Sequence, residues 1–190
     1  MNNVMLDLET LSANSNAFIL SIGAVEFDFN NETLGREFSV NISMTSEQKH
    51  SEIDPMTVSW WVKQSKEARL AAFDESNTCP LINALNHFST FLKECGPDVK
   101  VWGNGASFDN VILSNAYKNA NIKQPWKFRN DRDLRTLVAL AEDNDIAYAS
   151  DLPREGVHHK ALDDAKHQAN VACYINRRLL MKWSYNVENE

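Results

Sequence analysis

Short apolar runs near the start of the chain predict three β-strands. Residues 4–8 are apolar except for one acidic position, which is typical of a buried strand. Residues 17–29 begin apolar and then alternate with polar positions, and residues 33–42 alternate throughout. The pair Asn30-Asn31 is a turn signal between these two runs. Because the connections are short, we expect an antiparallel meander.

Helical periodicity dominates the rest of the chain. Leu81, Leu85, Phe88 and Leu92 share one helical face, and Gly96-Pro97 ends that helix. The other expected features are, in order, a helix that starts at Asp54-Pro55 and passes through Trp60 and Trp61, a helix cap at Thr78, a strand at 99–102, a helix at 108–120, a strand or extended piece near 126–128, a helix at 133–143, a loop at 151–156 and a helix at 160–180.

This order of elements predicts an α/β fold with a mixed central sheet, in which an antiparallel meander is joined by parallel strands and flanked by helices. We expect a single domain over residues 1–190, with a core from about residue 4 to about residue 180 and a short C-terminal tail. The hydrophobic share of 43% is close to the globular average and is enough to build such a core.

Charge and cysteine content argue against several classes of protein. A net charge of −7 argues against a protein that coats duplex nucleic acid. An acidic protein can still bind the end of a nucleic-acid strand where metal ions neutralise the site. Cys79, Cys95 and Cys173 are too widely spaced for a disulfide framework or a zinc ribbon. The sequence has neither a signal-peptide pattern nor an apolar stretch of about 18 residues, so we expect a cytoplasmic protein without a membrane partner.

Asp7 and Glu9 are the first candidates for chemistry. Residues two apart on a strand face the same way, so their carboxylates would converge. A carboxylate inside an apolar strand is costly unless it is paired, and a hard cation such as magnesium or manganese would relieve that cost. A chance Asp-x-Glu on a half-exposed strand is the alternative.

Two further acidic positions and a histidine occur where loops enter helices. Asp109 follows a glycine-containing loop and opens an apolar helix, where it can also act only as a favourable charge near the helix dipole. His159 precedes the final helix and Asp164 lies in its first turns. The unperturbed pKa of histidine suits a general base near neutrality. A solvated helix start is the alternative.

Together these segments resemble the three motifs of the DEDDh (DnaQ-like) 3′-5′ exonuclease family. The matching segments are Met5-Leu6-Asp7-Leu8-Glu9-Thr10, Asn104-Gly105-Ala106-Ser107-Phe108-Asp109 and His159-Lys160-Ala161-Leu162-Asp163-Asp164-Ala165. Residues 18–24 and 133–137 are most similar to the branch of phage exonuclease A and a mycobacterial adenylate-preferring exoribonuclease. One departure is the Leu11-Ser12-Ala13 segment, which replaces a glycine-bearing loop of many proofreading members.

The resemblance implies a ribonuclease H-like fold, a bacterial or phage-infected host cytosol, and 3′-5′ exonuclease activity that releases nucleoside 5′-monophosphates. It makes Asp7, Glu9, Asp109 and Asp164 ligands of two Mg²⁺ ions, with Mn²⁺ able to substitute, and His159 the general base. His158 and Asp163 are then not part of the motif. Substrate contacts are expected from Leu8, Glu9, Thr10 and Phe108. The partners implied are 3′ ends of single-stranded DNA or RNA, with DNA favoured, and a second copy in a homodimer.

Three other interpretations remain open from the sequence. The substrate can be RNA, because no motif reports on the 2′-hydroxyl. His159, Asp163 and His167 recur every four residues and can align on a helix as a mononuclear metal hydrolase site. The chain can also be a nuclease-like domain that only binds nucleic acid. Adjacent helical residues point about 100° apart, so one of Trp60 and Trp61 can pack in the core while the other is exposed and available to stack on a base.

Overall fold

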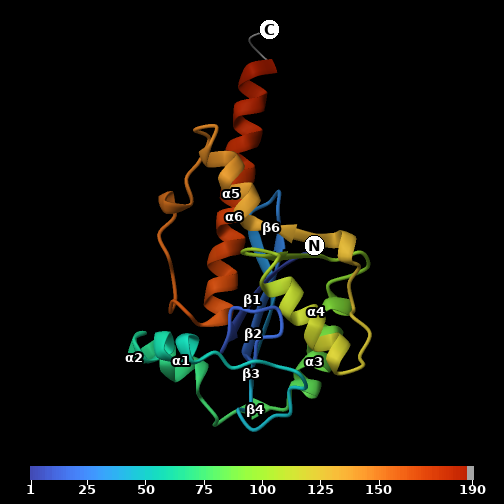
Figure 1. Cartoon of the computed structure of the whole chain (residues 1–190). Helices are drawn as coiled ribbons and strands as arrows, with labels where there is room; N and C mark the ends of the chain where they lie inside the picture. The colour runs from blue at the N-terminus through green and yellow to red at the C-terminus, as the bar shows by residue number, and fades with distance from the viewer. Residues whose placement is uncertain (188–190) are drawn as a thin grey trace.

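A six-stranded mixed sheet forms the centre of the computed structural model, which describes residues 1–187 (Figure 1). The strands are β1 (Asn3–Thr10), β2 (Ile19–Asp28), β3 (Thr33–Ile42), β4 (Thr78–Cys79), β5 (Lys100–Gly103) and β6 (Asp131–Asp133), and their order in the sheet is β4-β3-β2-β1-β5-β6. Strands β1, β2 and β3 form the expected antiparallel meander, whereas β4, β5 and β6 each pair in parallel with a neighbour. The predicted α/β class and mixed sheet are therefore confirmed.

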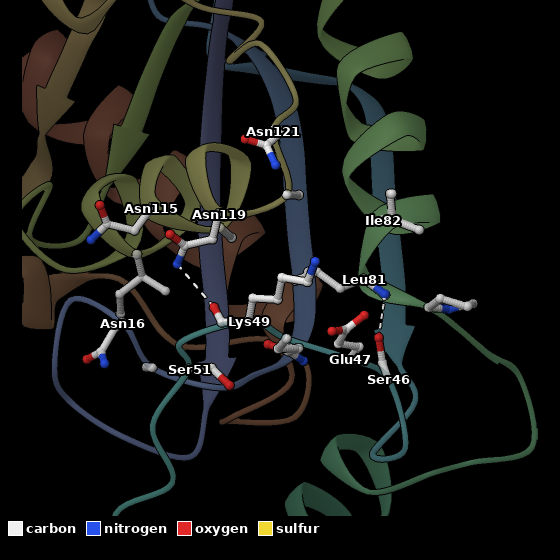
Figure 2. A pocket seen from close by; sticks show the side chains of 16 residues that line it. Asn16, Ser46, Glu47, Lys49, Ser51, Leu81, Ile82, Asn115, Asn119 and Asn121 are labelled. Carbon is white, nitrogen blue, oxygen red and sulfur yellow. Dashed lines mark hydrogen bonds between the residues drawn. The ribbon is translucent and has the colours of Figure 1, made fainter.

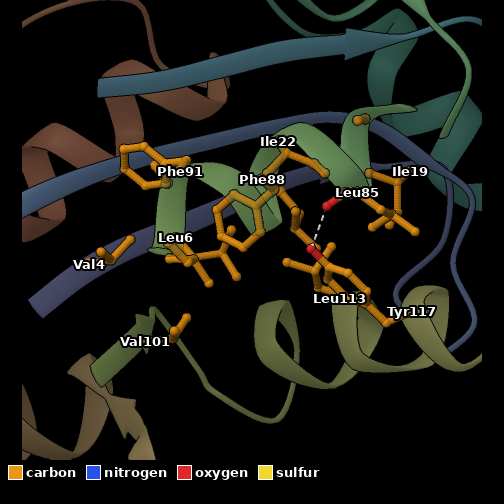
Figure 3. Packing of buried hydrophobic residues seen from close by; sticks show 14 of the residues in the cluster. Val4, Leu6, Ile19, Ile22, Leu85, Phe88, Phe91, Val101, Leu113 and Tyr117 are labelled. Atoms are coloured by element: carbon orange, nitrogen blue, oxygen red, sulfur yellow. Dashed lines mark hydrogen bonds between the residues drawn. The ribbon is translucent and has the colours of Figure 1, made fainter. Parts of the chain in front are cut away.

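Helices cover both faces of this sheet (Figure 1). They are α1 (Pro55–Val62), α2 (Lys66–Ala72), α3 (Leu81–Glu94), α4 (Asp109–Asn119), α5 (Leu134–Glu142) and α6 (Ala161–Val187), with short 3-10 turns at Phe128–Asn130 and Ala149–Asp151. On one face, Leu6 of β1 packs in a buried cluster with Phe88 of α3 and Leu113 of α4 (Figure 3). On the other face, Met5 packs in a cluster with Ala165 and other small residues of α6.

The alternation of β1 therefore decides which face each side chain enters. Leu6 and Leu8 belong to the cluster under α3 and α4, whereas Met5 belongs to the cluster under α6. Asp7 and Glu9 continue the Met5 register, so they share the face that α6 covers. Helix α6 is long and runs beyond the end of the sheet (Figure 1).

Several sequence-based boundaries were wrong. Thr78 does not cap a helix but forms the two-residue strand β4, which is too short to give a periodic signal, and α3 begins after Pro80. Residues 126–128 are not a strand, because the parallel strand is the polar Asp131–Asp133. Helix α2 was not predicted, and α6 continues past residue 180 to Val187. Within the described part of the chain, no helix has the length and apolar character to cross a membrane.

Candidate active site

The carboxyl end of β1 opens into a cavity of about 580 Å³ that contains all five residues predicted to be catalytic. They are Asp7, Glu9, Asp109, His159 and Asp164. The residues predicted to contact substrate, Leu8, Thr10 and Phe108, line the same cavity. Three segments that are far apart in the sequence thus meet at one place, and the cavity is large enough for a small ligand or a nucleotide.

A second cavity has different chemistry. It measures about 310 Å³ and lies between α3, α4 and the segment around residues 46–51 (Figure 2). The described residues that line it include two ionisable side chains, Glu47 and Lys49. Its amides hold the nearby loops, for example through the Asn119 Nδ2 atom, which donates to the Lys49 carbonyl over 3.2 Å. The acidic residues are concentrated in the first cavity, at the end of β1, and this cavity is therefore the candidate active site.

Strand β1 places its two acids on the face that α6 covers. Asp7 is partly buried, and Glu9 is only 6% exposed. The Glu9 Oε1 atom is buried and has no hydrogen-bond partner among the described residues. An unpaired buried carboxylate oxygen is costly, so this position suits a bound cation.

Asp109 links β1 to α4. It is the first residue of the helix and is buried, and its Oδ1 accepts a hydrogen bond from the Leu8 backbone N–H over 3.1 Å. The loop before it is fixed from the neighbouring strand, because Asp133 Oδ2 accepts from the Ala106 N–H over 2.6 Å. Gly103 lies so close to Asn110 that a Cβ there would lie 2.5 Å from the Asn110 Oδ1 atom. A Cβ at this position would displace the Asn110 side chain at the point where α4 begins beside the acids of β1.

His159 and Asp164 are joined by the backbone before α6. The His159 N–H donates to Asp164 Oδ2 over 3.1 Å, and Arg154 forms an ion pair with Asp164 Oδ1. His159 has a φ of 66°, in the left-handed region that is uncommon for a residue with a side chain. This conformation turns the chain sharply just before the helix, so the histidine and the aspartate five residues later border the same cavity.

Aromatic rings surround His159. Its ring centroid lies 4.8 Å from that of Trp60 and 6.1 Å from that of Trp61, with edge-to-face geometry in both cases. The His158 ring stacks on it at 3.8 Å. Trp61 is buried and its Nε1 donates to the Thr10 carbonyl over 2.9 Å, whereas Trp60 is 41% exposed. Both tryptophans line the cavity, but Trp61 is buried in a core cluster whereas Trp60 is the exposed one of the two.

The four carboxyl groups repel one another. Burial, followed by the charges of Asp109, Glu9 and Asp164, raises the pKa of Asp7 well above its usual range. Burial and the charges of Asp164 and Asp109 raise the pKa of Glu9 to about 8, and burial raises the pKa of Asp109 to about 7. A site that keeps these groups together without enough positive charge favours a bound cation.

The donor atoms fit a hard divalent cation. One oxygen each from Asp7, Glu9 and Asp164 lie within 4.8 Å of one another. A set made of carboxylate oxygens matches the preference of Mg²⁺ and Mn²⁺, and the unpaired Oε1 of Glu9 is available as a ligand. The residues present therefore fit the metal that the resemblance implies.

The alternative single-metal site is not assembled. Asp163 and His167 line a different cavity together with Glu155 and Lys166, and His159 is not part of it. Asp163 instead accepts a hydrogen bond from the Val157 N–H over 2.9 Å and pairs with Lys160. In the described residues, these three side chains do not form a metal-binding group.

Two cavity residues that contact the acids directly, Gln168 and Arg154, were missed from the sequence. Gln168 lies one helical turn after Asp164, and its Nε2 donates to Asp7 Oδ1 over 2.7 Å. The spacing of four residues from Asp164 was a usable signal for a shared helix face. Arg154 comes from an irregular loop, where no periodicity indicates where a side chain points.

The mixed sheet and its flanking helices have a ribonuclease H-like architecture. The solved structure of cell-death related nuclease 4 (CRN-4) matches with a TM-score of 0.67 and 17% identity, covering 94% of this chain and 64% of CRN-4. The nuclease domain of 3′hExo, a DEDDh family member bound to rAMP, matches with a TM-score of 0.62 and 11% identity, over 90% of each chain. At these identities the likeness shows the fold, and it confirms the ribonuclease H-like expectation.

The chain belongs to the family of the 3′-5′ exoribonuclease Rv2179c-like domain, whose model matches residues 2–176. An exodeoxyribonuclease of Enterobacteria phage T4 is 24% identical over 161 residues, covering 73% of this chain and 71% of the phage protein. The chain is accordingly a 3′-5′ exonuclease that acts on nucleic acid, and the predicted relationship to DEDDh exonucleases is confirmed. This class of enzyme uses divalent metal ions.

Proposed function

We propose that this chain removes nucleoside 5′-monophosphates from the 3′ end of single-stranded nucleic acid by a two-metal-ion mechanism. Asp7, Glu9, Asp109 and Asp164 hold two Mg²⁺ ions, which Mn²⁺ can replace, and His159 is the general base. The observation that carries this proposal is the convergence of four carboxyl groups from β1, α4 and α6 in one cavity, with a buried oxygen of Glu9 left unpaired.

The roles of the side chains follow from their positions. When bound, a pair of divalent ions neutralises the charge of the scissile phosphate and lowers the pKa of the attacking water. The imidazole of His159 accepts a proton from that water. Burial and the neighbouring His158 lower the pKa of His159, so its ring is neutral and ready to accept a proton near pH 7. The His159 N–H bond to Asp164 holds the base beside a metal ligand.

The walls of the cavity suit the end of a flexible single strand. Trp60 and Phe108 present rings to the cavity on which a base can stack, and Arg135 and Arg154 bring positive charge to its rim. Leu8, Glu9 and Thr10 lie beside the acids, where the terminal nucleotide with its free 3′-hydroxyl would contact them. With a net charge of −7, the chain offers little attraction for a long stretch of duplex.

We propose DNA as the preferred substrate, because the phage relative is an exodeoxyribonuclease. RNA is the second candidate, because the matching family model is that of an exoribonuclease domain. A time course on matched single strands of DNA and RNA, labelled at the 5′ end, decides between them. The DNA proposal predicts faster shortening of the DNA ladder with either Mg²⁺ or Mn²⁺, and faster shortening of the RNA would reverse the preference.

The same assay tests the mechanism. Asp7→Asn removes one ligand charge from the cavity and is expected to abolish shortening while the protein stays folded. Asp163→Asn is the matched control, because it makes the same change next to Asp164 at the start of α6, at a residue that does not line this cavity. Full activity in Asp7→Asn, or activity that survives exhaustive chelation, would refute the two-metal proposal.

We also propose that the chain forms a homodimer. Val58, Val62 and Leu70 on α1 and α2 are exposed apolar side chains outside the acidic cavity, and they offer area for such a contact. Light scattering on the purified protein is expected to give twice the monomer mass, and Val62→Asp is expected to shift the mass towards that of one chain. A monomeric mass at micromolar concentration would exclude the dimer.

A further inference from the structure

Among the described residues, Gln168 makes a single polar contact, and that contact is to a residue of the acidic cavity. The side chain is only 6% exposed, and its Nε2 atom donates to Asp7 Oδ1 over 2.7 Å. Its Oε1 atom is buried and has no partner among the described residues. The amide therefore donates one hydrogen bond to a carboxylate, and its carbonyl oxygen has no partner among the described residues. An unsatisfied end is uncommon for a buried polar group.

A comparison with Gln48 shows what a structural amide looks like in this chain. Gln48 uses both ends on one backbone position: its Oε1 accepts from the Ile19 N–H over 2.9 Å, and its Nε2 donates to the Ile19 carbonyl over 2.8 Å. Gln168, by contrast, has no side-chain hydrogen bond to a backbone group, and its Oε1 atom has no partner, among the described residues. Its one hydrogen bond is the one that it donates to Asp7.

A neutral donor is the suitable partner for Asp7. The carboxyl group of Asp7 lies among Glu9, Asp109 and Asp164 and can rotate about its Cα–Cβ and Cβ–Cγ bonds unless a contact fixes it. An arginine or lysine at this position would fix the carboxylate but would add a second positive charge to the one that Arg154 already brings to Asp164. An amide N–H fixes one oxygen, keeps the negative charge and leaves the second oxygen free.

We propose that Gln168 is a positioning residue that orients the Asp7 carboxylate for metal binding. The inference rests on the proposed metal-dependent function and adds a residue outside the five-residue motif. Helix α6 then serves the site twice, because Asp164 is itself a ligand and Gln168, one turn later on the same face, orients a ligand on β1. Loss of the amide is expected to weaken metal binding 10–100-fold, the range typical for groups that support a metal ligand.

Titration calorimetry with Mn²⁺ tests this proposal without any substrate. Gln168→Leu and Gln168→Met replace the amide with an apolar side chain of similar size and so remove the donor, and both are expected to raise the dissociation constant for Mn²⁺ by about 10–100-fold. The Mn²⁺ concentration that gives half-maximal cleavage should rise in parallel, whereas KM for the oligonucleotide at saturating Mn²⁺ should change little. The use of two variants ensures a result if one of them does not fold.

Gln48→Leu is the matched control. It removes an amide with two hydrogen bonds at a distance from the acids, so it is expected to lower the melting temperature and leave Mn²⁺ affinity unchanged. Wild-type Mn²⁺ affinity in both Gln168 variants would overturn the positioning role while leaving the proposed function intact. Failure of the wild-type protein to bind Mn²⁺ would overturn the proposed function and this inference together.

Discussion

Gly23 on β2 lies directly against Ala161, the first residue of α6. A Cβ atom added to Gly23 would lie 2.1 Å from the Ala161 carbonyl carbon and 2.2 Å from the Leu162 nitrogen, distances that real Cβ atoms do not show. Gly23 is also the residue that pairs with Asp7 across the β1–β2 ladder. The absence of one side chain thus lets the start of α6 approach the sheet at the level of Asp7, and this brings His159 and Asp164 to the acids of β1.

Gly23→Ala is therefore expected to damage both stability and activity. Overpacking typically costs about 1–3 kcal/mol in free energy of unfolding, and we expect the upper end of that range or more, because the atoms in the way are backbone. Any helix shift that relieves the clash moves Asp164 away from Asp7, so cleavage should fall more than stability alone explains. Urea denaturation and the cleavage assay, both below the melting temperature of the variant, measure the two effects.

Gly35→Ala is the control for this substitution. It is also a strand glycine, but the atoms nearest to its added Cβ are ends of the Glu26 and Met1 side chains, at 2.9 and 3.0 Å, which can move. A smaller loss of stability and unchanged cleavage are expected. If Gly23→Ala were no worse than Gly35→Ala, the close approach of α6 to β2 would not be what assembles the cavity.

The raised pKa of Glu9 predicts that the stability of the folded protein depends on pH and on bound metal. Its pKa is raised from 4.5 to about 8 in the folded chain, mainly by burial, so the folded state binds more protons than the unfolded state between these values. Stability of the metal-free protein is therefore expected to fall as pH rises from about 5 to about 8. Adding Mn²⁺ should raise the melting temperature more at pH 8 than at pH 6, because the metal binds the deprotonated carboxylate.

Differential scanning fluorimetry across this pH range, with chelator or with Mn²⁺, checks the prediction. Glu9→Gln removes the titrating group, and its metal-free melting temperature should fall less steeply with pH. Glu47→Gln, at an exposed site in the second cavity, should retain the wild-type slope. Identical slopes in wild type and Glu9→Gln would show that folding does not raise the pKa of Glu9.

Most of the acidic site could be predicted because it depends on local rules. Strand alternation alone places Asp7 and Glu9 on one face, and the transitions from loop to helix place Asp109 and Asp164 near helix starts. These relationships need no knowledge of the tertiary fold. The order of the motifs then supplied the remaining step, which is that the three segments meet.

The contacts that hold the site together were not predictable in this way. The pairing of Gln168 with Asp7 joins residues 161 positions apart, and it exists only because α6 lies across β1. The role of Gly23 depends on the same packing, since a strand glycine by itself does not show what approaches it. Helical geometry separates Trp60 from Trp61 by about 100° but does not say which one faces the core.

The lowered pKa of His159 predicts where the acid limb lies in the pH profile of the cleavage rate. Burial, then the charge of His158, lowers the pKa of His159 below 6.5, with Asp164 acting in the opposite direction. A general base works in its neutral form, so the acid limb of the rate profile should lie below pH 6.5 at saturating metal. His158→Ala removes a positive neighbour, which should raise the pKa of His159 and move that limb to higher pH.

Single-turnover cleavage from pH 5 to pH 8 measures this limb. His159→Ala should slow cleavage by about 10²–10⁴-fold and remove the limb, whereas His158→Ala should retain most of the rate near pH 8. Equal losses in the two variants would contradict the choice of His159 as the base. A His158→Ala limb that moves to lower pH would contradict the electrostatic argument.

Trp60 and Trp61 should separate substrate binding from stability. Trp60 is 41% exposed at the cavity, so Trp60→Ala is expected to weaken oligonucleotide binding by about 1–3 kcal/mol, or roughly 5–150-fold, through the loss of base stacking. Trp61 is buried and bonded to the Thr10 carbonyl, so Trp61→Ala is expected to cost about 3–5 kcal/mol of folding stability instead. Fluorescence anisotropy with a labelled single strand and Ca²⁺, together with urea denaturation, measures both quantities. A Trp60→Ala protein with wild-type affinity would exclude the ring as a stacking platform, and the contact of Trp60 with His159 would then be its remaining role in the cavity.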